Sequence, residues 1–289
     1  MKPLHLAAAL LMVSVWGANF IVIRAGLNEV PPLTLTLLRF TLAAFPAVLL
    51  VPRPRVGWRA LAAYGLFAFA LQFVFLFGGM AIGMPTGLAS LVIQIQAFFT
   101  IALAMFFTGE RPRALQIAGS VAAGAGIVVI ALDLPAGDTQ VGLVLVLAAA
   151  LSWAIGNLIV KRMRQPATPN GPLAIVIWSS AFACVPLAIA VLLVDGPATL
   201  AEITRSLSAL QWLGIAFQAW PTTLLAFGLW AWLLRLYPAT LIAPFTLLVP
   251  VVAMSGAAWL LDETISGWEL AGAALVLAGL ALNVFGFRR

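Results

Sequence analysis

Ten long runs of apolar residues make up most of this sequence, and very few charged residues interrupt them. A run of about 20 apolar residues is long enough to cross the roughly 30 Å hydrocarbon core of a bilayer as a helix. The runs are apolar on every face, whereas the strands of a transmembrane barrel alternate in polarity. The sequence therefore predicts an all-α integral membrane protein with ten transmembrane helices. Their approximate bounds are 4–23, 33–51, 59–79, 86–108, 113–132, 141–160, 172–194, 210–233, 239–261 and 267–287.

The few charged residues are distributed unevenly across the membrane. If the N-terminus is cytoplasmic, twelve of the fifteen Lys and Arg residues fall on the cytoplasmic side, and eight of the nine Asp and Glu residues fall on the other. Cytoplasmic segments of membrane proteins carry an excess of Lys and Arg. We therefore expect a multi-pass protein with both termini in the cytoplasm. The pI of about 10.7 then reflects the orientation of the protein in the membrane rather than a surface that binds a polyanion, so we expect no nucleic-acid partner.

The chain lacks the residue types that most enzymes and metal sites need. It has one cysteine, Cys184, and one histidine, His5, which leaves no His/Cys cluster and no nucleophile paired with a histidine. The apolar runs also contain no pair of carboxylates. We expect no catalytic residue, no metal and no cofactor, and we expect that the protein is not an enzyme.

Two halves of the chain share a pattern of polar and turn-forming residues. The stretch around Asn19 returns around Asn157 at a shift of 138 positions, and MPTGLASL at 84–91 aligns with YPATLIAP at 237–244 at a shift of 153. The sequence thus predicts a repeat of 1–136 and 137–289, each with five helices. Because five is odd, the second repeat must enter the membrane in the opposite sense, as in secondary transporters whose inverted repeats surround one central site. The second shift also pairs the following residues: Pro85 with Pro238, Glu110 with Glu263, Gly119 with Gly272, and Gly126 with Gly279.

Several polar and aromatic side chains lie inside the predicted helices. An unpaired amide in hydrocarbon is costly, so we expect these side chains to face the bundle interior or a water-filled cavity. Gln94 and Gln96 are two residues apart and do not share a helix face, and we favour Gln94 as the one that lines a cavity. The candidate substrate-binding residues are Trp16, Asn19, Gln72, Gln94, Trp153, Asn157, Gln218, Trp220 and Thr223.

The repeated asparagines have two interpretations. As interhelical links, Asn19 and Asn157 would each hydrogen-bond a neighbouring helix, which is a common use of such residues. As binding residues, they would face each other across the axis between the repeats and contact a substrate. Arg39 also lies inside a helix; we favour snorkelling of its side chain to the outer surface, with binding of a substrate carboxylate as the alternative.

The glycines and two prolines are expected to shape the scaffold. Gly119 and Gly126 form a small-residue stripe on the fifth helix, and Gly272 and Gly279 form one on the tenth. Such stripes allow close helix packing. Pro85 and Pro238 stand where the fourth and ninth helices begin or bend.

Four motifs together resemble one transporter family: WGANFIVIR at 16–24, LRF at 38–40, PTGLASL at 85–91 and GERP at 109–112. The chain is similar over essentially its whole length to the EamA-type transporters of the drug/metabolite transporter superfamily, and among them to YddG-like exporters of aromatic amino acids. This resemblance implies ten helices in two inverted halves around a central cavity in the bacterial inner membrane. The second half departs from the pattern, since Trp153 is shifted by one position and GERP becomes DETI at 262–265.

The leading hypothesis is a secondary transporter that exports amino acids, aromatic or otherwise neutral, and related metabolites by alternating access. Alternatives are export or exchange of cysteine-pathway metabolites, nucleobases or drugs. A channel is a further alternative, although the sequence has no selectivity-filter-like loop. The last alternative is an intramembrane enzyme that acts on lipid. We expect a small-molecule substrate and membrane lipids as partners, and a monomer, with a dimer through the glycine stripes as the alternative.

Overall fold

The computed structural model describes residues 1–108, 112–163, 171–237 and 242–286, and these ranges contain helices and loops but no strand. The first half comprises α1 (Pro3–Leu27), α2 (Pro32–Ala44), α3 (Ala47–Leu50), α4 (Trp58–Tyr64), η1 (Gly65–Leu71), α5 (Gln72–Ala81), α6 (Thr86–Val92), η2 (Ile93–Ile95), α7 (Gln96–Thr108) and α8 (Ala114–Asp133). The second comprises α9 (Asp138–Arg162), α10 (Gly171–Val194), α11 (Pro197–Ser206), α12 (Ala209–Phe217), η3 (Gln218–Leu225), α13 (Ala226–Leu236), η4 (Ala243–Leu247), α15 (Leu248–Leu260) and α16 (Gly267–Gly286).

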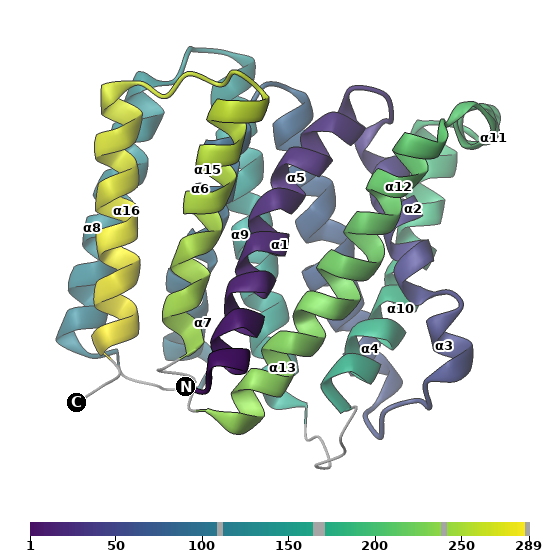
Figure 1. Cartoon of the computed structure of the whole chain (residues 1–289), viewed down its shortest axis with the longest axis horizontal. Coiled ribbons are helices and arrows are strands. Elements are labelled where there is room, and N and C mark those ends of the chain that lie inside the picture. Colours follow the sequence, from purple (N-terminus) through teal and green to yellow (C-terminus); the bar gives the residue numbers. More distant parts are fainter. Residues whose placement is uncertain (109–111, 164–170, 238–241, 287–289) are drawn as a thin grey trace.

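Consecutive helices join end to end into membrane-length spans. Within the described ranges, nine spans are long and apolar enough to cross a bilayer, and a shorter apolar helix, Phe245–Leu260, lies where the ninth of ten spans is expected. The prediction of an all-α membrane protein is thus confirmed (Figure 1). Pro238 and Glu110 lie outside the described residues.

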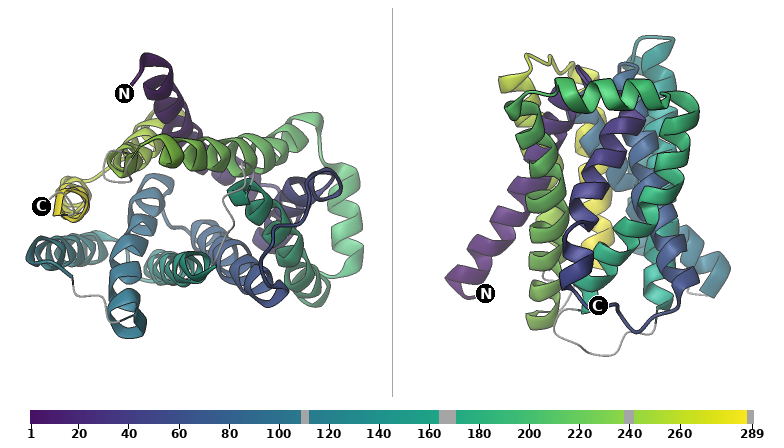
Figure 2. Two further views of the ribbon diagram at one scale, coloured as in Figure 1. Left: turned by 90° about the horizontal axis from the view of Figure 1, so that it is seen from below. Right: turned by 90° about the vertical axis from the view of Figure 1, so that its right-hand side faces the viewer.

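Two local features differ from the ten expected spans. The second span is not continuous, because α2 ends at Ala44, Phe45 is extended, and α3 begins only after Pro46. A proline cannot donate to the helix ladder and pushes the residue before it out of the helical region. The second feature is α11, which begins with Pro197 and lies across the end of the bundle between α10 and α12 (Figure 2).

Helices of one repeat pack against their counterparts in the other. The fifth and tenth spans meet as α8 and α16, the second and seventh as α2 and α10, and the fourth and ninth as α6 and α15. The third span packs against the sixth through α5 and α9. Their counterparts, the eighth and first spans, pack against each other in the same way through α13 and α1. The helices α8 and α16 run antiparallel, side by side at one edge of the molecule (Figure 1). This arrangement is the one expected of two inverted repeats.

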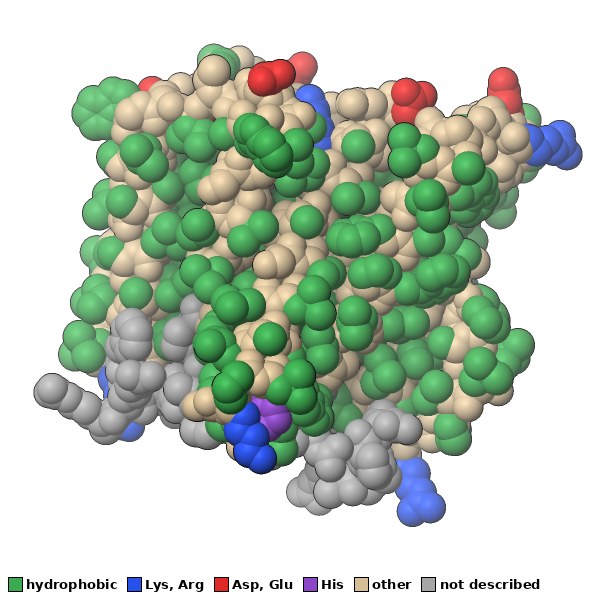
Figure 3. Space-filling view, in the orientation of Figure 1, with side chains coloured by type: hydrophobic (Ala, Val, Ile, Leu, Met, Phe, Trp, Pro, Cys, Tyr) green, Lys and Arg blue, Asp and Glu red, His purple; other side chains and the backbone are tan. Residues whose placement is uncertain are grey.

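The two ends of the bundle differ in charge. Helix α1 begins and helix α16 ends at the same end of the bundle (Figure 1). On the face drawn in Figure 3, acidic side chains lie at the opposite end, and the surface between the ends is mostly hydrophobic. An apolar belt between two charged ends is what a bilayer requires of a protein that spans it.

The third and eighth spans, which are counterparts in the repeat, share an unusual backbone. Each contains a π-helical segment near its middle: η1 in the third span and η3 in the eighth. Such segments are rare, and they occur often at functional sites because the wider turn redirects side chains and frees backbone groups. Each segment also adjoins a buried glutamine, Gln72 after η1 and Gln218 at the start of η3.

Candidate functional site

A group of polar side chains gathers around η3, where the two repeats meet. It consists of Trp16 and Asn19 of α1, Arg39 of α2, and Gln218, Thr222 and Thr223 of η3, and we call these six residues the η3 cluster. Apart from Trp16, none of them exposes more than 4% of its surface. The structure thus brings together four of the candidate binding residues, Trp16, Asn19, Gln218 and Thr223.

Arg39 is held inside the bundle. Its side chain is 1% exposed, and its Nε and Nη2 atoms donate to Thr223 Oγ1 at 3.4 and 3.1 Å. Its guanidinium carbon lies 4.0 Å from the centre of the Phe73 ring. The expectation that Arg39 snorkels to the outer surface is therefore wrong. The physical reason is that α2 presents this side chain to η3 and α5 rather than to lipid, where a hydroxyl and an aromatic face receive it.

The π turn of η3 sets the orientation of the Thr223 hydroxyl. This hydroxyl donates its single proton to the backbone oxygen of Gln218, five residues earlier, at 2.9 Å. Its lone pairs remain as acceptors, and Arg39 uses them. The backbone of η3 thus makes Thr223 an acceptor for the cation of the other repeat.

Two hydrogen bonds join α1 to η3. Thr222 Oγ1 donates to Asn19 Oδ1 at 3.1 Å, and Trp16 Nε1 donates to the backbone oxygen of Thr222 at 3.2 Å. The ring of Trp16 also packs edge-on against Phe227, with 5.4 Å between ring centroids. Both faces of η3 that carry polar groups are therefore bonded to the first repeat, one through α1 and one through α2.

The second repeated asparagine has different partners. Asn157 Nδ2 donates to Gln96 Oε1 at 2.7 Å and to Thr100 Oγ1 at 3.2 Å, which joins α9 to α7. Asn19 and Asn157 thus belong to two separate hydrogen-bonded groups rather than to one shared group. Each bonds a neighbouring helix, as in the first of the two interpretations.

The remaining candidates lie outside the η3 cluster. Gln94 is buried, and its Nε2 donates to the backbone oxygen of Thr246 at 3.1 Å, which links the fourth span to the ninth. Gln72 is buried at the start of α5. Trp153 is half-buried and packs at the edge of the main hydrophobic core.

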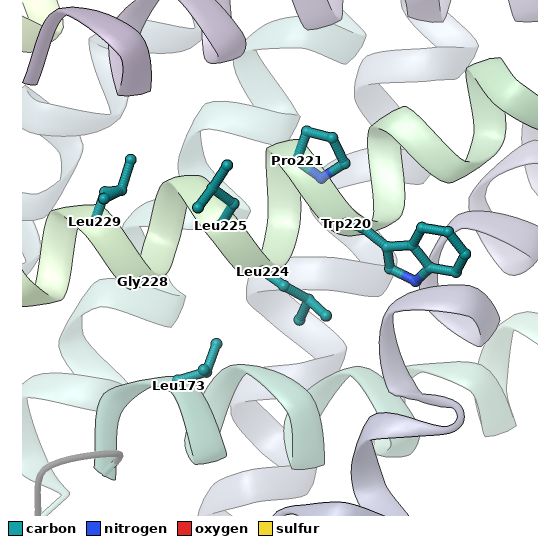
Figure 4. A pocket seen from close by; sticks show the side chains of 7 residues that line it. All are labelled: Leu173, Trp220, Pro221, Leu224, Leu225, Gly228 and Leu229. Carbon is teal, nitrogen blue, oxygen red and sulfur yellow. The ribbon is translucent and has the colours of Figure 1, made fainter. Parts of the chain in front are cut away.

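Trp220 lies on a different face of η3 from the polar residues. It is 48% exposed, and its Nε1 donates to the backbone oxygen of Leu42 at 3.0 Å. Here it borders a cavity of about 660 Å³ between α10 and the η3–α13 helix (Figure 4). The cavity is open, and apolar residues and one glycine line it: Leu173, Trp220, Pro221, Leu224, Leu225, Gly228 and Leu229. The polar part of the η3 cluster does not line this cavity and is closed in this conformation.

The candidate scaffold residues occupy helix contacts and a helix start. A Cβ on Gly119 would lie 2.5 Å from the backbone oxygen of Gly279, and one on Gly126 would lie 2.6 Å from that of Gly272. Pro85 stands just before α6, where the backbone N–H groups of Thr86 and Gly87 donate to Glu263 at 2.9 and 3.1 Å.

Two threonines of these groups, Thr222 and Thr100, were not among the candidate binding residues. They carry no signal of their own, because threonine occurs at many positions of membrane helices as a simple link. Gln96 was passed over in favour of Gln94, yet Gln96 is the glutamine that bonds Asn157. Arg39 did carry a signal, since a charge in the middle of a span needs a partner. What the sequence lacked was the identity of that partner. Among the described residues, no group of three or more His, Cys, Asp or Glu side chains forms a metal site.

Comparison with known proteins agrees with this fold. The chain is 44% identical over 282 residues to a protein of Escherichia coli (strain K12) named "Probable amino-acid metabolite efflux pump", covering 97% of this chain and 94% of that protein. It is 30% identical over 282 residues to a "Probable terminal-alkyne amino-acid exporter" of Streptantibioticus cattleyicolor, covering 95% and 91%. A solved crystal structure shares the fold, with a TM-score of 0.65 at 19% identity over 100% of this chain and 99% of the other.

A family model matches the chain twice, once in each half. The matches cover residues 4–132 and 140–285, which together hold nearly all the described spans. The description of this family is the EamA-like transporter family. The resemblance inferred from the motifs is thereby confirmed, and the chain belongs to the EamA-like transporter family.

Proposed function

We propose that this chain exports amino acids and related neutral metabolites across the bacterial inner membrane by alternating access. As a member of the EamA-like transporter family, it is a multi-pass membrane transporter and not an enzyme. The names of two relatives refer to amino-acid metabolite efflux and to amino-acid export, and they support the substrate class and the direction.

The proposed mechanism rests on the position of the η3 cluster. Its residues come from α1 and α2 of the first repeat and from η3 of the second, all well within their spans. Carriers with inverted repeats bind substrate near the middle of the membrane, where the repeats meet, and rocking of one repeat against the other exposes the site to each side in turn. Aromatic rings border the polar groups, since Trp16 belongs to the cluster and Phe73 stacks on Arg39. Such a site suits a small amphipathic solute.

The distribution of charge supports an orientation with both termini in the cytoplasm. Lys2 precedes α1, and Lys161 and Arg162 end α9 at the same end of the bundle. Asp133 and Asp138 lie at the opposite end, as the last residue of α8 and the first residue of α9. Fusion of alkaline phosphatase and of a fluorescent protein to each terminus tests this orientation. Fluorescence without phosphatase activity is expected at both termini, and phosphatase activity at either one contradicts it.

We also propose that the protein works as a monomer. The glycine stripes of α8 and α16 contact each other within one chain, so these stripes are not free to form a dimer. Mass measurement of the detergent-solubilised protein tests this point. A stable dimer would contradict it.

Transport itself is tested with purified protein in proteoliposomes. Labelled phenylalanine, threonine and cysteine are supplied with and without a pH gradient, and saturable flux of at least one is expected. Asn19→Ala removes the acceptor for Thr222 and with it a hydrogen bond that joins α1 to η3. We expect this change to lower the flux about tenfold, which corresponds to a loss of about 1.4 kcal/mol. Ser14→Ala is the matched control, because Ser14 is an exposed polar residue of the same helix.

Three results would contradict the proposal in different ways. Absence of flux for all three amino acids would exclude the substrate class. Flux that does not saturate would indicate a channel. A chemically altered solute would indicate an enzyme.

A further inference from the structure

Arg39 has more hydrogen-bonding capacity than this conformation uses. A guanidinium carries five N–H donors, and here Nε and Nη2 share a single acceptor, the hydroxyl of Thr223. The Nη1 atom is fully buried and has no hydrogen-bond partner among the residues that the structure describes. A buried donor without an acceptor is costly, and a buried full charge is more so. An acceptor that carries a negative charge would remove this cost.

The aromatic neighbours of Arg39 do not use its remaining N–H groups. The Phe73 ring stacks on one face at 4.0 Å, and Phe40 lies at 5.3 Å. Stacking engages the flat face, whereas the N–H groups point outward in the plane of the guanidinium. This planar fork matches the two oxygens of a carboxylate, which bind it with two parallel hydrogen bonds.

A second residue of the η3 cluster also has an unused polar group. The Oε1 atom of Gln218 is buried and also has no partner among the described residues. Thr223 connects the two residues, because its hydroxyl accepts from Arg39 and donates to the backbone oxygen of Gln218. The η3 cluster therefore contains an unused cationic donor, on Arg39, and an unused neutral acceptor, on the side chain of Gln218. A zwitterionic amino acid has the complementary groups, a carboxylate and an ammonium.

We propose that Arg39 binds the carboxylate of the transported amino acid and that Gln218 Oε1 accepts a hydrogen bond from its ammonium group. The inference rests on the proposed export of amino acids, and it adds which ends of the substrate are recognised and by which residues. Arg39 belongs to the first repeat and Gln218 to the second, so the bound substrate bridges the two repeats. Because both residues are closed off here, the repeats must separate at η3 before the substrate enters.

A purely structural arginine and a carboxylate-binding arginine differ in one measurable property, the discrimination between an acid and its amide. The test uses the amino acid that the wild type transports best among threonine, phenylalanine and cysteine, together with its own amide. The amide keeps the side chain and the ammonium but lacks the negative charge. Competition against labelled amino acid is measured in proteoliposomes, and stabilisation of the solubilised protein against heat is measured with each compound. The wild type is expected to prefer the acid by about tenfold or more.

The variants separate the two halves of the proposal. Arg39→Gln should reduce the preference for the acid to about one, and Arg39→Lys should restore part of it, since lysine supplies charge without the fork. Gln218→Leu should weaken the binding of the acid and of the amide by a similar factor, and should leave the ratio of the two affinities unchanged. Arg24→Gln is the control, because Arg24 is a cation of α1 that donates to the backbone oxygen of Met80, outside the η3 cluster.

Loss of folding in one variant leaves the test intact. If Arg39→Gln does not fold, Thr223→Val keeps Arg39 but removes the hydroxyl that positions it, and it should lower the preference for the acid. The wild-type comparison of acid and amide needs no variant. Equal binding of the two by a wild type that transports the acid would overturn the inference and leave the proposed function standing. Retention of the preference by a folded Arg39→Gln protein would overturn it as well. Absence of transport of all three amino acids by the wild type would contradict the proposed function itself.

Discussion

Gly119 of α8 and Gly279 of α16 meet backbone to backbone, and a Cβ added to Gly279 would lie 2.4 Å from the backbone oxygen of Gly119. About two helical turns further along α8, Gly126 meets Gly272 in the same way. The order of the two contacts is reversed along the chain, because α8 and α16 are counterparts in inverted repeats and run antiparallel. Small residues allow such close approach, and the resulting van der Waals contact drives helix association in lipid. The stripe therefore ties the two repeats together at one edge of the molecule.

Substitution of Gly279 by alanine should destabilise the protein. The added methyl group meets backbone atoms that cannot move aside without shifting a helix, and overpacking of this kind costs about 1–3 kcal/mol. Thermal or SDS unfolding of the solubilised protein measures the change. Gly124→Ala is the control, because it lies on α8 with no atom within 4 Å of the added Cβ. Equal stability of the two variants would contradict the close contact.

Glu263 should stabilise the start of α6. Its carboxylate accepts hydrogen bonds from the backbone N–H groups of Thr86 and Gly87, where the helix dipole favours a negative charge. Glu263→Gln should lower the unfolding free energy by about 0.3–1 kcal/mol and speed hydrogen exchange in the first turn of α6. Asp262→Asn removes a neighbouring exposed charge and should have no such effect. Unchanged exchange at Thr86 and Gly87 in the Glu263 variant would count against this role.

The bond between Asn19 and Thr222 should appear as energetic coupling. A double-mutant cycle with Asn19→Ala and Thr222→Val isolates the pair, because the valine is nearly the same size as threonine. Coupling of about 0.6 kcal/mol is typical of such bonds inside membranes, with an upper limit near 1.7 kcal/mol. Unfolding free energies of the wild type, both single variants and the double variant give the value. Strict additivity would show that the two side chains do not stabilise each other.

The open apolar cavity should accept a larger side chain. Gly228 lines it, and a Cβ at that position meets no atom within 4 Å. We expect Gly228→Leu to change the unfolding free energy by less than about 0.5 kcal/mol. Gly156→Leu is the contrasting variant, since a Cβ there would lie 2.7 Å from the Cβ of Ala68, and a cost of about 1–3 kcal/mol is expected. A similar loss in both variants would mean that the cavity is closed in solution.

Parts of the candidate site could be read from the sequence, and parts could not. Asn19, Gln218 and Thr223 stood out because polar side chains inside apolar runs must find partners. The assignment of Arg39 went wrong because its partner, Thr223, lies 184 positions further along the chain. The sequence pattern shows that a partner is needed, but only the packing of α2 against η3 shows which one. The π turns of η1 and η3 were not predicted from the sequence.

The same division holds for the molecule as a whole. The sequence by itself determined the class of the protein, the approximate positions of its spans and the presence of two related halves, because a bilayer admits only long apolar helices and because the repeated residues occur in both halves. Tertiary structure decided which helix faces meet, and therefore the pairing of Asn157 with Gln96 rather than with the asparagine of the first repeat. In an apolar run every face is compatible with lipid. Contacts between helices distant in sequence, rather than local pattern, thus select the faces that become interior.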